Sequence, residues 1–160
     1  IALKSKNTPS VIALSRQKVS YINPDNSKEN QCENGAYTVN LTSHESNVTL
    51  IASGTEVELA IKVQEKLKEN NIHSKVVSMP CMELFDKQPE DYKKDIIEEN
   101  SLVVTLEAGS ITHWRKYVNN KGFNLGIDQF GESAPYKEVY DHFNLNEDKI
   151  ASLIQKKLRE

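Results

Sequence analysis

The sequence contains few residues of the kinds that define specialised protein classes. Its 160 residues include only two cysteines, six glycines, five prolines and one tryptophan. No apolar run approaches the roughly 18 residues of a membrane-spanning helix, and the N-terminus lacks the charged-then-apolar layout of a signal peptide. A fibrous or disordered class does not fit this composition, and the cytoplasm is the expected location.

An excess of charge of one sign is absent as well. The 20 basic and 23 acidic side chains are mixed along the chain and give a formal net charge of -3. This balance offers no electrostatic attraction to nucleic acid or to a membrane surface, and neither is an expected partner.

Sequence motifs for catalysis are also missing. Neither of the phosphate-cradling patterns, GxGxxG and GxxxxGK[ST], occurs, and there is no GxSxG nucleophile elbow. The four histidines fall in four different segments without the spacing of metal ligands. Cys32 and Cys81 have no CxxC spacing, so free thiols are expected. These searches therefore identify no phosphate-binding loop, no serine nucleophile and no metal site.

The sequence does contain an alternation of short apolar runs and amphipathic stretches. The apolar runs predict strands at 10–14, 35–39, 48–52, 75–79, 102–106 and 124–127. Several of these runs are almost continuously apolar, which is typical of a parallel sheet buried on both faces. We therefore predict an α/β domain with three layers, α/β/α, around a mostly parallel, mixed sheet of five strands.

Three helices are predicted from their starting residues. Thr55 followed by Glu58 has the spacing of a capping box, and Ser133 precedes Pro135 as an expected helix cap rather than a nucleophile. Asn146 is the expected cap of the last helix. The apolar faces expected to be buried are Val57, Ala60, Ile61 and Leu67 in the first helix, Tyr136, Val139, Tyr140 and Phe143 in the second, and Ile150, Ala151, Ile154 and Leu158 in the third.

Arg16 is the residue best placed to bind a ligand. It directly follows the predicted strand at 10–14, between Ser15 and Gln17, so its side chain would leave the C-terminal edge of a sheet, where α/β proteins bind ligands. A guanidinium there can make two parallel hydrogen bonds to a phosphate, which the point charge of lysine cannot reproduce. A structural ion pair is the alternative role.

Three further places carry weaker candidates. Glu107 ends the strand predicted at 102–106, where burial could raise its pKa and let it act on a substrate; alternatively it orients a neighbouring loop. The turn at 53–55 opens a helix whose N-terminus could bind an anion or could simply be capped. Trp114 is expected to pack in a core or an interface rather than to stack on nucleic acid bases.

Five segments, taken in order, resemble one family, the transketolases. The first looks like the last strand of the pyrimidine-binding domain, and the others resemble successive parts of the C-terminal domain. These segments are TPSVIALSRQ (8–17), LIASGTEVELA (50–60), VVSMPCMELFDKQ (76–88) with YKKDI (92–96), VVTLEAG (103–109) and FGESAPYKEVYDHF (130–143).

The resemblance implies a function and a site. Transketolases transfer a two-carbon ketol unit between sugar phosphates in the pentose phosphate pathway, as homodimers, with thiamin diphosphate and Mg or Ca as cofactors. The arginine of their LSRQ segment binds the substrate phosphate, which corresponds to Arg16 here. Their cofactor motifs have no counterpart in this sequence, so this segment is expected to bind no cofactor and to be inactive alone.

The resemblance also implies a division of the chain. Residues 1–19 correspond to the tail of the preceding pyrimidine-binding domain, 20–34 to a linker rich in Asn, Lys and Glu, and 35–160 to the C-terminal domain. The start at Ile1, without an initiator methionine, fits a fragment of a longer chain. The alternatives are a stand-alone ligand-binding or regulatory module of the same fold, and the C-terminal part of a related thiamin enzyme.

Overall fold

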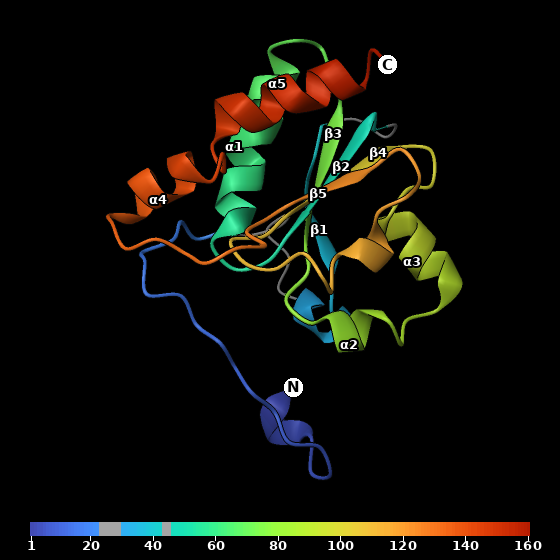
Figure 1. Cartoon of the computed structure of the whole chain (residues 1–160). Coiled ribbons are helices and arrows are strands. Elements are labelled where there is room, and N and C mark those ends of the chain that lie inside the picture. The colour runs from blue at the N-terminus through green and yellow to red at the C-terminus, as the bar shows by residue number, and fades with distance from the viewer. Residues whose placement is uncertain (23–29, 43–45) are drawn as a thin grey trace.

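A mixed sheet forms the centre of the protein. The computed structural model describes residues 1–22, 30–42 and 46–160. Within them, five strands are present (Figure 1), at Tyr37–Leu41 (β1), Val48–Ala52 (β2), Ser74–Ser78 (β3), Leu102–Leu106 (β4) and Phe123–Leu125 (β5). Their order is β1-β3-β2-β4-β5, with β1 antiparallel to β3 and every other pair parallel. The predicted strands at 48–52 and 102–106 have the observed bounds.

Helices cover both faces of this sheet. The α-helices are Glu56–Lys68 (α1), Met82–Phe85 (α2), Glu90–Ile96 (α3), Tyr136–His142 (α4) and Glu147–Lys157 (α5), and short 3₁₀ helices lie at Ala2–Lys4, Gln31–Asn34 and Arg115–Tyr117. In Figure 1, α1, α4 and α5 lie together on one side of the sheet, and α2 and α3 lie on the other. The three-layer α/β/α prediction is therefore confirmed.

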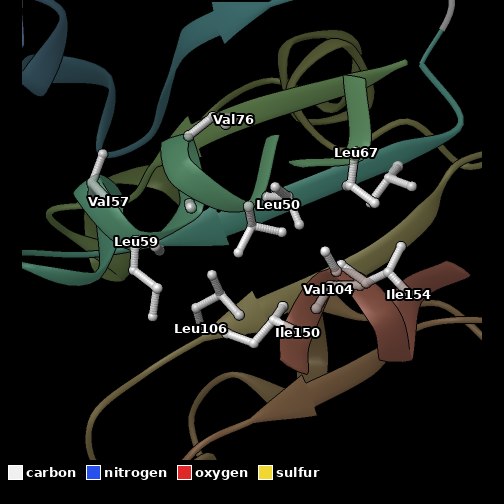
Figure 2. Packing of buried hydrophobic residues seen from close by; sticks show 14 of the residues in the cluster. Leu50, Val57, Leu59, Leu67, Val76, Val104, Leu106, Ile150 and Ile154 are labelled. Carbon is white, nitrogen blue, oxygen red and sulfur yellow. The ribbon is translucent and has the colours of Figure 1, made fainter. Parts of the chain in front are cut away.

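Alternate side chains of the central strands enter two separate cores. Leu50 and Val76 point to one face and pack with residues of α1 and α5, as Figure 2 shows. Ile51 and Val77, the next residue in each strand, point to the other face and pack against Phe85 of α2. All four strand residues are fully buried. Because successive strand residues face opposite sides, only a sheet covered on both faces can bury such a run.

The first predicted helix cap is wrong. Helix α1 begins at Glu56 as expected, but the side chain of Thr55 makes no capping hydrogen bond. Glu58 does not reach back to close a capping box; its carboxylate instead accepts a hydrogen bond from the backbone N–H of Ser20 and pairs with Lys62. A contact with a distant segment has replaced the local one.

The other two predicted caps have opposite outcomes. Ser133 does not cap α4, which begins after Pro135 without any side-chain cap. The predicted buried face of α4 is only partly covered, and Tyr136 is 50% exposed. Asn146 does cap α5, because its Oδ1 accepts a hydrogen bond from the N–H of Lys149 at 2.9 Å.

The segment at 10–14 does not form the strand that its composition predicts. Val11, Ile12 and Leu14 are 97%, 70% and 85% exposed, and no strand in the described part of the chain pairs with them. A strand needs a partner for its backbone hydrogen bonds, so an apolar run without one does not become a strand. In Figure 1 this segment extends away from the sheet.

The region predicted as a linker is described only at its two ends. Ile22 packs against the core beneath α1 and α5, and residues 31–34 form a 3₁₀ helix. The remainder, 23–29, lies outside the described residues. In the described part of the protein, no helix is both long and apolar enough to cross a membrane.

Candidate functional site at the carboxyl edge of the sheet

The ends of β2 and β4 bring polar groups to one edge of the sheet. The two strands pair in parallel, with Ala52 beside Leu106, so the residues that follow them leave on the same side. After β2 comes a tight turn in which Gly54 has φ +54°, a left-handed conformation that suits glycine. After β4 comes Glu107. This is the edge at which α/β proteins commonly bind ligands.

Glu56 is a buried carboxylate held by hydroxyl groups. It is only 5% exposed, and no lysine or arginine of the described residues forms an ion pair with it. Thr55 Oγ1 donates a hydrogen bond to Glu56 Oε1 at 2.7 Å, and the phenol of Tyr140 donates to the same oxygen. Burial, together with the hydrogen bond to Glu56, raises the pKa of Tyr140, so this phenol stays protonated and remains a donor.

Glu107 lies beside Glu56 and is hydrogen-bonded to a residue of the core on the other face of the sheet. Trp114 Nε1 donates a hydrogen bond to Glu107 Oε2 at 2.9 Å, and the indole is buried in the core on the face of α2 and α3. Burial raises the pKa of Glu107, and the charge of Glu56 raises it further. Glu107 therefore orients the loop that carries Trp114, which was one of its two predicted roles, and Trp114 packs in a core as predicted.

The described side chains at this edge offer groups for hydrogen bonding and proton binding. Two neighbouring carboxyl groups can hold a proton more tightly than either alone. Within the described residues, no three His, Cys, Asp or Glu side chains are grouped so that they could hold a metal ion. Cys32 and Cys81 are free thiols that lie outside this cluster.

A cavity of about 310 Å³ adjoins the cluster of carboxyl and hydroxyl groups. Residues 17–19 form one wall, and α1, α4 and the start of α5 form the others. Its polar lining has both signs of charge, with Lys18 and Lys137 among the cations and Glu147 among the anions. Thr55 and Tyr140 line this cavity and also contact Glu56, so they link the two features.

Arg16 lies at the start of the wall formed by residues 17–19. Its side chain is exposed, and its guanidinium makes no hydrogen bond or ion pair with the described residues. The sheet edge from which it was expected to emerge is not formed, because 10–14 is not a strand. The structure therefore brings Thr55, Glu56, Glu107 and Tyr140 together, and it leaves Arg16 next to the cavity.

Sequence reasoning missed the pairing of Glu56 with Tyr140. A glutamate in the first turn of a helix is normally exposed to solvent and interacts favourably with the helix dipole. The sequence therefore gives no indication that Glu56 is buried. Tyr140 was predicted to be part of an apolar face, which is correct for its ring but not for its hydroxyl. The two residues are 84 positions apart, and no local pattern could connect them.

Comparisons with known proteins identify relatives along almost the whole chain. Residues 35–146 match the family described as the transketolase-like TK C-terminal domain. A transketolase from Aquifex aeolicus is 38% identical, and the match covers 98% of this chain and 23% of the relative. The chloroplastic transketolase of Solanum tuberosum is 37% identical over 95% of this chain and 21% of its own length.

Solved structures give the same result. A transketolase from Pichia stipitis in complex with sedoheptulose-7-phosphate has a TM-score of 0.74 and 27% identity, over 81% of this chain and 18% of that protein. A transketolase from Campylobacter jejuni has a TM-score of 0.72 and 33% identity, over 79% of this chain and 19% of that protein. The chain thus spans about a fifth of the length of the relatives that it matches.

Proposed function

The chain belongs to the transketolase-like C-terminal domain family, and from that premise we propose that it is the C-terminal segment of a transketolase. The complete enzyme would transfer a two-carbon ketol unit between a ketose phosphate and an aldose phosphate. It would act as a homodimer with thiamin diphosphate and Mg or Ca, in the cytoplasm. The observation that carries this proposal is the match with a transketolase over 98% of the chain, which includes the stretch around Arg16.

The described residues do not fit the divalent cation that accompanies the cofactor. A divalent cation needs several oxygen ligands around it, and no suitable group of carboxylates is present among these residues. The two buried carboxylates, Glu56 and Glu107, instead face Tyr140 and Trp114, which hold them in place. In our proposal the cofactor is bound elsewhere in the complete enzyme, and this segment is inactive alone.

The contribution that we propose for this segment is a substrate contact and a scaffold. Arg16 would bind the phosphate of the sugar substrate by two parallel hydrogen bonds. Its guanidinium is exposed and has no partner among the described residues, so it is available for such a contact. In this proposal residues 1–19 belong to the preceding pyrimidine-binding domain, 20–34 form a linker, and 35–160 form the domain that supports assembly of the dimer.

Ketol transfer by the complete enzyme tests the role of Arg16. The rate constant kcat/KM is measured for the Arg16→Ala variant with a phosphorylated acceptor and with an otherwise similar acceptor that lacks the phosphate. Losing a charge-assisted contact with the phosphate should cost about 2 to 5 kcal/mol for the first acceptor and little for the second. Arg16→Lys should recover only part of the loss, because lysine keeps the charge without the paired donors.

A matched control separates the local effect from a general loss of charge. Arg159 is an exposed arginine at the other end of the chain, and Arg159→Ala should leave both acceptors unaffected. Equal and small effects of Arg16→Ala on both acceptors would remove Arg16 from the substrate site. If the unmutated complete enzyme transfers no ketol unit, the related thiamin enzymes and the stand-alone module become the better explanations.

A further inference from the structure

The chain from Asp128 to Glu138 is exposed at every residue. It comprises the loop after β5 and the first three residues of α4. We call residues 128–138 the α4 face. Between Gln129 and Ala134, no backbone group forms a hydrogen bond with the backbone of another described residue. The domain itself therefore offers this stretch little contact, and its apolar side chains are left open to a partner.

The α4 face exposes two aromatic rings. Phe130 is 98% exposed and Tyr136 is 50% exposed. An aromatic side chain buries about 150 to 250 Å² when it is covered, so exposed rings are strong apolar anchors for an interface. Exposed charged side chains accompany them, namely Glu132, Lys137 and Glu138. Aromatic anchors with charged residues of both signs around them are typical of a surface that binds another protein surface.

The fold holds the ring of Tyr136 in place. It packs edge-on against the ring of Tyr140, with the ring centroids 5.9 Å apart and an angle of 87° between the ring planes. The hydroxyl of Tyr140 is in turn bound to the buried carboxylate of Glu56. Because this support orients the ring of Tyr136 beforehand, covering the ring costs little additional side-chain entropy.

The segment that leads in from the preceding domain lies next to the α4 face. Residues 17–19 line the cavity beside α1 and α4, and Tyr136 and Lys137 line the same cavity. In Figure 1 the N-terminal segment, in blue, runs beside the loop that leads into α4, in orange. The proposed function assigns residues 1–19 to the tail of the preceding domain. The chain spans about a fifth of the length of its relatives, so in that proposal most of the enzyme continues from this tail.

We propose that the α4 face is the surface on which the preceding domain of the complete enzyme docks, with Phe130 and Tyr136 covered by an apolar part of that domain. The inference rests on the proposed function, which supplies the preceding domain. It adds the surface by which the C-terminal domain is oriented against the rest of the chain. The position of residues 17–19 beside Tyr136 favours this occupant over a second copy of the protein, because these residues are continuous with the preceding domain.

Photo-crosslinking in the complete enzyme identifies what covers Phe130. The photoreactive substitution Phe130→p-benzoylphenylalanine is introduced, the enzyme is irradiated, and the cross-linked peptides are identified by mass spectrometry. Leu158→p-benzoylphenylalanine is the matched control, because Leu158 is 40% exposed and lies at the C-terminal end of α5. We expect position 130 to form cross-links with the preceding domain of the same chain, and position 158 to form none with that domain.

A denaturing gel separates the two possible occupants. A cross-link within one chain keeps the mass of a single chain, whereas a cross-link between two copies doubles it. A doubled mass would assign the α4 face to a second copy and would overturn the proposal. Cross-linking to the preceding domain that is no more efficient from position 130 than from position 158 would overturn it as well.

Hydroxyl-radical footprinting of the unmodified complete enzyme gives a second measurement that needs no substitution. The rate at which Phe130 is oxidised in the native enzyme is compared with its rate in the urea-unfolded enzyme. An uncovered Phe130, 98% exposed, would react at nearly the unfolded rate, whereas coverage by the preceding domain should slow the reaction roughly fivefold or more. Equal rates in the native and unfolded enzyme would contradict the docking of this face.

Ketol transfer by the same unmodified enzyme tests the proposed function separately. An enzyme that transfers ketol units while Phe130 stays fully reactive would remove the docking inference and leave the proposed function standing. If no ketol unit is transferred, the proposed function fails, and the cross-links from position 130 still decide whether the preceding part of the chain covers the α4 face.

Discussion

The phenol of Tyr140 and the carboxylate of Glu56 join α4 to the first turn of α1. The two residues are 84 positions apart, and the phenol donates to the same oxygen that accepts from Thr55. Helix α4 has no fully buried residue, and its predicted apolar face is only partly covered. Because so little apolar area holds α4 in place, we expect this hydrogen bond to contribute to the attachment of the helix.

Replacing Tyr140 with phenylalanine tests that contribution. The change removes the hydroxyl and leaves the ring, so Glu56 stays buried with Thr55 as its remaining donor. We expect the free energy of unfolding to fall by about 1 to 2 kcal/mol. The measurement is urea unfolding followed by the fluorescence of Trp114. Tyr136→Phe, on the same helix, is the control: that side chain is half exposed and should have almost no effect. Equal effects of the two changes would show that the hydrogen bond contributes nothing specific.

The carboxyl group of Glu107 should make the stability of the protein depend on pH. Burial raises the pKa of Glu107 above its ordinary value of 4.5, and the charge of Glu56 raises it further. The folded protein then binds this proton more tightly than the unfolded chain does. The resulting stability is fully present below about pH 4.5 and is lost as the pH rises through the folded pKa.

Glu107→Gln isolates this effect, because the amide cannot ionise and its carbonyl oxygen can still accept from Trp114. Urea unfolding at a series of pH values from 4 upward, in steps of about half a unit, gives the difference in stability between the two proteins. We expect the variant to gain relative to the parent as the pH rises above 4.5, and the difference to become constant once Glu107 is ionised. A difference that does not change with pH would contradict the raised pKa.

Gly35 should tolerate no side chain. Its φ is +82°, and a Cβ atom built there would lie 2.2 Å from the backbone nitrogen of Phe85 and 2.5 Å from the carbonyl oxygen of Cys81. Both obstacles are backbone atoms, so neither can rotate away. Gly35→Ala is expected to lower the free energy of unfolding by more than about 3 kcal/mol, or to prevent folding. Gly131→Ala is the matched control, since a Cβ there meets open space. Similar unfolding midpoints for the two variants would refute the close packing around Gly35.

The central part of the fold follows from local sequence patterns. The runs at 48–52 and 102–106 are apolar at every position, or nearly so, and a strand buried on both faces is the structure that satisfies such a run. Asn146 followed by acidic residues and an apolar face predicts α5 for an equally local reason. In these segments, the short-range preference and the tertiary environment favour the same structure.

Only the tertiary structure decided the polar contacts and the fate of the segment at 10–14. Glu58 binds Ser20 rather than its own helix, and Tyr140 binds Glu56, because folding brings together groups that lie 38 and 84 positions apart. Residues 10–14 have the composition of a strand, but a strand requires a neighbour, and in the described part none is there. The sequence determined which residues prefer to be buried and, where a neighbouring strand is present, which elements they form. Which partner each hydrogen-bonding group meets depends on the packing of distant segments, and only the folded chain specifies it.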